Sequence, residues 1–76
     1  MSVDIFNFLK EKKGIPVNAT WPNKDILIWK FTSAIQIISL NENYELERIH
    51  NGKFERQKIN TVEELKGKLS ELNIEL

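Results

Sequence analysis

An Asn-Gly dipeptide is the feature that most constrains how this chain can fold. Asn51 and Gly52 lie between two runs of residues with strand character, 44–50 and 53–59. Asn and Gly adopt positive φ at low cost, and both central positions of a type I′ turn require it. The dipeptide therefore predicts a tight β-hairpin with a two-residue turn.

Charge pairing selects one register for this hairpin. A two-residue turn places Arg48 opposite Glu55 and Glu47 opposite Arg56, whereas a three-residue turn would set the two arginines against each other. Cross-strand pairs of opposite charge contribute roughly 0.2–1 kcal/mol each, so the first register is favoured. It also creates these facing pairs: Tyr44 and Ile59, Glu45 and Lys58, Ile49 and Phe54.

Two apolar runs precede the hairpin. Residues 25–31 and 34–40 are dense in isoleucine, leucine and aromatic residues, which is typical of strands buried on both faces. Thr32 and Ser33, with or without Ala34, are few enough to join these runs as an antiparallel hairpin. A two-residue and a three-residue turn are both compatible with the sequence here.

The remaining connections are expected to contain no strand. Residues 15–24 include both prolines and two asparagines, which favours an irregular surface segment. Residues 41–43 suit a three-residue loop with Asn43 in the left-handed region. Such a loop would pair Leu40 with Tyr44 and thereby set the register of the neighbouring strands.

A helix is predicted at each end of the chain. Ser2 is a suitable N-cap for the first helix, and Gly14 followed closely by Pro16 is a stop signal. Thr61 and Glu64 form the capping-box pattern of a second helix that ends near residue 73. Apolar residues recur at helical spacing in both helices: Ile5, Phe8 and Leu9 in the first, Val62, Leu65, Leu69 and Leu72 in the second.

These elements predict an α+β fold in a single domain, residues 1–76, with the order helix, four-stranded antiparallel meander, helix (α-β-β-β-β-α). Eleven basic and eleven acidic residues are interspersed, which argues against a polyanion-binding tail. The sequence shows no signal-peptide pattern, and no apolar stretch approaches the roughly 20 residues of a membrane span. We therefore expect a soluble cytoplasmic protein without a membrane partner.

The inventory of reactive side chains argues against an enzyme. The chain has no cysteine, its single histidine, His50, adjoins the tight turn, and no serine is flanked by nucleophile-elbow glycines. One histidine without cysteine cannot supply the usual three or four zinc ligands. The three glycines stand too far apart to form a phosphate-binding loop. We predict no catalytic residue, no metal and no cofactor.

The expected registers leave apolar residues on both faces of the sheet. If both helices pack on the face that carries Tyr44, Leu46 and Ile59, the opposite face is exposed, and an exposed apolar face usually marks an interface. We predict a protein partner or a homodimer; a monomer with one helix on each face is the alternative. The predicted interaction surface comprises Ile35, Ile37, Ile49 and Phe54, joined by Trp29 and Phe31 if the first hairpin has a three-residue turn.

Binding of single-stranded nucleic acid is the second function that the residue types allow. Lys30, Arg48, Lys53 and Arg56 could contact phosphates while Trp29 and Phe31 stack on bases. The zero net charge and the glutamates that alternate with these basic residues weigh against it. Nucleic acid is therefore the less favoured partner.

Overall fold

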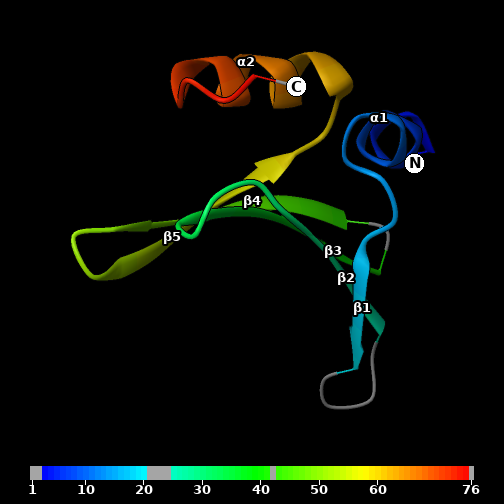
Figure 1. Cartoon of the computed structure of the whole chain (residues 1–76), viewed down its shortest axis with the longest axis horizontal. Helices are drawn as coiled ribbons and strands as arrows, with labels where there is room; N and C mark the ends of the chain where they lie inside the picture. Colours follow the sequence, from blue (N-terminus) through cyan, green and yellow to red (C-terminus); the bar gives the residue numbers. More distant parts are fainter. Residues whose placement is uncertain (1–2, 21–24, 42, 76) are drawn as a thin grey trace.

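The computed structural model describes residues 3–20, 25–41 and 43–75 and shows an α+β fold. Five antiparallel strands form one sheet in chain order, and both helices lie on the same side of it (Figure 1). Each strand thus pairs with its neighbours in sequence. The elements are α1 (Val3–Lys13), β1 (Val17–Thr20), β2 (Asp25–Lys30), β3 (Ile35–Leu40), β4 (Asn43–His50), β5 (Lys53–Ile59) and α2 (Val62–Glu71).

Local signals set the ends of both helices. In α1, Asp4 lies in the first turn and lysines fill the last turn, so the charges complement the helix dipole. Gly14, at φ 91°, donates its amide to the Lys10 carbonyl at 2.9 Å and ends the helix as predicted. The predicted N-cap, Ser2, lies outside the described residues. In α2, the prediction of Thr61 as the N-cap is confirmed, because its Oγ1 accepts the Glu64 amide at 3.0 Å.

The C-terminus of α2 is closed by a Schellman motif. Asn73 has φ 59° and donates its amide to the Ser70 carbonyl at 3.0 Å. The Ile74 amide donates to the Leu69 carbonyl at 2.9 Å. This turn directs Ile74 back against the hydrophobic core.

The predicted β4–β5 hairpin is confirmed in every facing pair. Asn51 and Gly52 have φ values of 52° and 74°, as a turn with two left-handed residues requires. Ile49 faces Phe54 and Glu47 faces Arg56. A two-residue turn and alternating charges are therefore sufficient to specify this part of the sheet.

The β2–β3 connection is the three-residue alternative. Lys30 pairs with Gln36, and the Phe31 amide donates to the Ile35 carbonyl at 3.0 Å, which leaves residues 32–34 as the turn. Trp29 is consequently opposite Ile37. These two residues therefore project from the same face of the sheet.

The predicted β3–β4 register is wrong by one residue. Leu40 pairs with Asn43, and Ser39 rather than Leu40 faces Tyr44. Asn41, with φ 51°, is the left-handed residue in place of Asn43. A shift of one residue transfers the side chains of an entire strand to the other face. The observed register puts Ile37 rather than Ile38 on the face of Tyr44.

Packing explains why this register is adopted. It places Trp29 on the same face as Tyr44, and their rings lie 6.2 Å apart. The edge of Phe6 from α1 contacts Trp29 at 5.8 Å between ring centroids, with an interplanar angle of 79°. Three aromatic rings thus join α1, β2 and β4 in one layer. The predicted register would have separated Trp29 from Tyr44.

The expectation of an irregular connection over residues 15–24, and hence of only four strands, is wrong for residues 17–20, while residues 21–24 lie outside the described part of the chain. Val17–Thr20 forms the edge strand β1, which pairs with β2 along its whole length. Both prolines fall outside β1, so neither occupies a position in its ladder. Pairing with an otherwise free edge of β2 outweighs the weak strand propensity of the Asn-Ala pair in its centre.

The hydrophobic core lies between the helices and one face of the sheet. Trp29 is only 2% exposed, and its indole Nε1 donates to the Gly14 carbonyl at 3.1 Å, which ties the end of α1 to β2. The indole is therefore both buried and hydrogen-bonded. The buried apolar residues are Ile5 and Leu9 of α1, Trp29, Ile37, Tyr44, Leu46 and Ile59 of the sheet, and Leu65 and Leu69 of α2.

Two glycines provide a test of this architecture. Gly52→Ala should lower the free energy of unfolding by about 1–2 kcal/mol, because φ 74° strains an L-residue even though a Cβ would meet no atom within 4 Å. Gly67→Ala in α2 should raise it by up to about 1 kcal/mol, since a Cβ there also meets nothing and alanine favours the helix. Urea unfolding followed by circular dichroism would measure both. Equal effects of the two substitutions would contradict the left-handed turn.

Candidate functional site: the open face of the sheet

The face of the sheet that turns away from the helices is the candidate functional site. Strand alternation defines its members, because partners in the ladder project to the same side. We call this surface the open face, and Figure 1 shows both helices on the other side of the sheet. Its residues are Val17, Ala19, Ile26, Ile28, Lys30, Gln36, Ile38, Leu40, Asn43, Glu45, Glu47, Ile49, Phe54, Arg56 and Lys58.

One end of the open face is apolar. Val17, Ile28 and Ile38 form one cross-strand row, and Ala19, Ile26 and Leu40 form the next. These six residues of β1, β2 and β3 are called the apolar patch. Val17 remains 62% exposed, while the three isoleucines are half-buried by one another and by the sheet. Neighbouring β-branched side chains that no other element covers form a flat apolar surface, from which a binding partner can displace water.

A row of polar side chains borders the apolar patch. Lys30, Gln36, Glu47 and Arg56 follow one another across β2 to β5, and we call them the polar band. Gln36 Nε2 donates to Glu47 Oε1 at 2.6 Å, and Arg56 Nε donates to Glu47 Oε2 at 2.8 Å. Glu47 is only 6% exposed, yet both of its oxygens are satisfied. Such a paired carboxylate is a structural element and not a free general base.

The hairpin tip lies beyond the polar band. Ile49 and Phe54 form a facing pair in which Ile49 is 43% and Phe54 69% exposed. Figure 1 shows that the β4–β5 hairpin extends well past the helices. A hollow of about 220 Å³ adjoins the tip, with Thr32, Ser33 and Ala34 among its lining residues. An exposed ring and a hollow therefore lie side by side on the same face.

The structure separates the residues of the predicted interaction surface. Ile49 and Phe54 lie on the open face. Trp29 and Ile37 are buried beneath the helices, and Phe31 and Ile35 pack against the same core. The prediction that these four share a face with Phe54 is wrong, because it depended on the incorrect β3–β4 register.

The basic residues considered for nucleic-acid binding are also divided. Lys30 and Arg56 belong to the open face, where Arg56 is engaged by Glu47. Arg48 and Lys53 project to the other side of the sheet, and Arg48 Nη2 lies 3.0 Å from His50 Nδ1. Neither Trp29 nor Phe31 is available on the open face to stack on a base. The structure does not bring the elements of this alternative together.

The apolar patch was not identified in the sequence as a candidate surface. Residues 25–31 are apolar at nearly every position, so alternation gives no preference for Leu27 and Trp29 over Ile26 and Ile28 as the buried set. Side-chain size is the signal that could have decided it. The indole needs both volume and a hydrogen-bond acceptor, and only the side with the helices supplies them.

Other classes of site find no support in the described residues. Within them no three His, Asp or Glu side chains are grouped so as to hold a metal ion, and no helix is long and apolar enough to cross a membrane. Comparison of the chain with protein-family models, curated proteins and solved structures finds no match. The open face is therefore the surface from which a function can be inferred.

The polar band yields a prediction about stability. Arg56→Ala should lower the free energy of unfolding by about 1–2 kcal/mol, because it removes a charged donor from the buried Glu47 carboxylate. The effect stays below that of a fully buried pair since the arginine side chain is itself 60% exposed. Urea unfolding at low protein concentration would measure it.

Lys58→Ala is the matched control, because Lys58 is an exposed cation of the same strand and face. Its substitution should change the free energy of unfolding by no more than about 0.5 kcal/mol. If both variants lost the same stability, the hydrogen bond to Glu47 would not be the cause.

Proposed function

We propose that this protein is a non-enzymatic interaction module that self-associates through its open face. The observation that carries the proposal is the placement of both helices on one side of a sheet whose other side bears the apolar patch and the hairpin tip. Partly exposed apolar surface of this extent is characteristic of an interface. We propose a cytoplasmic location, with which a chain that has no cysteine is compatible because it needs no disulfide.

The accessible area supports a second layer of protein on this face. A monomer of 8.9 kDa is expected to expose about 4800 Å². This chain exposes 5427 Å². The surplus is of the same order as the roughly 800 Å² that each partner buries in a stable interface. This surplus belongs to the whole chain, and the uncovered open face is one contributor to it.

The open face is also suited to its own copy. A two-fold axis makes an interface self-complementary, so each surface must carry both a protrusion and a recess. Phe54 protrudes beside the hollow that the β2–β3 turn borders. The polar band and its neighbours Glu45 and Lys58 carry charges of both signs. A two-fold axis near the hairpin tip would set Phe54 of each copy into the hollow of the other, and the mixed charges of the face would allow unlike charges to lie opposite one another.

A partner of strong single charge fits this face less well. The mixed charges of Lys30, Glu45, Glu47 and Arg56 would repel part of any polyanion or polycation. Nucleic acid also lacks an exposed stacking ring in the centre of the sheet, because Trp29 is buried. We therefore rank a second copy above a nucleic acid as the occupant.

Phe54→Asp should abolish self-association. Each dimer would lose two aromatic contacts of about 1.5–3 kcal/mol and would have to accommodate two carboxylates. The dissociation constant should therefore rise at least about 100-fold. Sedimentation equilibrium over a concentration series would measure it, with a circular dichroism spectrum to verify that the variant is folded.

Ile15→Asp is the control, because it makes the same kind of change at an exposed residue, 86% accessible, outside the strands. It should leave the dissociation constant unchanged. A wild-type chain that stays monomeric at all concentrations, or a Phe54→Asp variant that still dimerises, would refute self-association. An oligonucleotide added in a parallel run should cause no increase in mass.

A further inference from the structure

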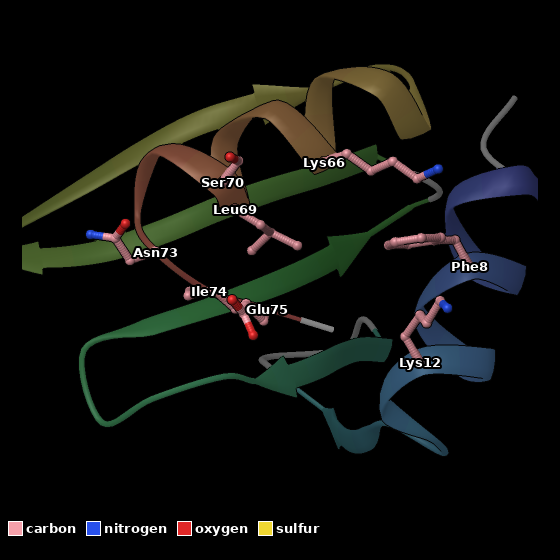
Figure 2. A pocket seen from close by; sticks show the side chains of 8 residues that line it. All are labelled: Phe8, Lys12, Lys66, Leu69, Ser70, Asn73, Ile74 and Glu75. Atoms are coloured by element: carbon pink, nitrogen blue, oxygen red, sulfur yellow. The ribbon is translucent and has the colours of Figure 1, made fainter.

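A groove between the two helices is independent of the open face. It has a volume of about 450 Å³, within the usual range for small-molecule sites, and its lining residues come from α1, α2 and the segment that follows α2. Figure 2 shows Phe8 of α1 facing Leu69 of α2 and the C-terminal segment across the opening. The remaining lining residues are Lys12, Lys66, Ser70, Asn73, Ile74 and Glu75.

The groove has an apolar part, formed by Phe8, Leu69 and Ile74, among polar and charged lining residues. Phe8 and Ile74 are half-buried side chains that pack against the core, and Leu69 is part of it. The Schellman turn holds Ile74 in place, because its amide is bonded to the Leu69 carbonyl. The backbone at Ile74 is thus fixed relative to α2, while Phe8 is supplied by α1.

Two lysines line the α1 side of the groove, and Figure 2 shows their amines on either side of the Phe8 ring. Lys66 Nζ lies 5.5 Å from the centroid of the Phe8 ring, and Lys12 follows Phe8 by one helical turn on the same face of α1. Within the described part of the chain, neither lysine forms an ion pair. Figure 2 shows the Glu75 carboxylate beside Ile74, away from both lysine amines.

We propose that this groove binds a small amphipathic carboxylate, with the carboxylate between Lys12 and Lys66 and the hydrocarbon part against Phe8, Leu69 and Ile74. Among the described residues neither lysine has an ion-pair partner, and the anionic head would supply one. Its apolar body would cover the half-buried side chains of Phe8 and Ile74. Charge at one end and apolar surface along the rest select against a simple inorganic anion and against an uncharged alkyl compound.

Sodium octanoate is the probe, titrated below the concentration at which it forms micelles and followed by heteronuclear NMR. Shifts should concentrate at Leu69, Ile74 and Phe8. Heptyl glucoside, which has the same seven-carbon alkyl chain on an uncharged head group, should bind at least tenfold more weakly. Equal binding of the two compounds, or shifts confined to the apolar patch of the open face, would overturn the proposal.

A pair of double variants separates the site from general charge. Lys12→Gln with Lys66→Gln should weaken octanoate binding at least tenfold. Lys53→Gln with Lys58→Gln removes the same charge from β5 and should change it less than twofold. Ser70→Trp, at an exposed position of the lining, should block binding while both lysines remain. Equal affinities of the two double variants, or no octanoate binding by the wild type, would refute the site.

Binding of octanoate in the groove should not depend on self-association. Phe54 lies on the opposite side of the sheet, so the Phe54→Asp variant should bind octanoate as the wild type does. A loss of binding in this variant would assign the ligand to the open face and overturn the groove as its site.

Discussion

The packing of Trp29 is the interaction on which the rest of the structure depends. Its indole donates to the Gly14 carbonyl, contacts the edge of Phe6 and lies against Tyr44. One side chain thereby joins the end of α1 to the second and fourth strands. Because Trp29 must face the helices, the neighbouring isoleucines at positions 26 and 28 must face away from them. The apolar surface on the open face is thus a direct consequence of the side on which Trp29 is buried and finds its hydrogen-bond acceptor.

Local chemistry made much of the fold predictable. Asn51 and Gly52 specify a hairpin because their conformational preference and the facing charges favour the same register. Thr61 and Gly14 similarly define helix ends from single residues. By contrast, the register at residues 41–43 depends on contacts between elements that are distant in sequence. Asn41 and Asn43 have the same tolerance of positive φ, so the turn alone could not distinguish them.

In the candidate site, too, local residues specify one part and contacts between distant elements specify the rest. Ile49 and Phe54 follow the well-specified hairpin, and their place on the sheet could be predicted from the sequence. Two residues of the apolar patch, Val17 and Ala19, lie in β1, whose central Asn-Ala pair carries little strand propensity and is ordered by pairing with β2. The burial of Glu47 could likewise not be predicted from the sequence, because a glutamate in a strand rich in charged residues is usually exposed to solvent.

The two edges of the sheet differ in a way that bears on assembly size. The outer strand β5 carries Lys53, Glu55, Arg56 and Lys58, and charged side chains oppose the addition of another strand. β1 offers only four residues on the other edge. Lateral growth into fibrils is thus disfavoured at both ends, although the apolar patch is partly open. In the proposed self-association through the open face, growth by addition of strands at either edge would therefore be disfavoured.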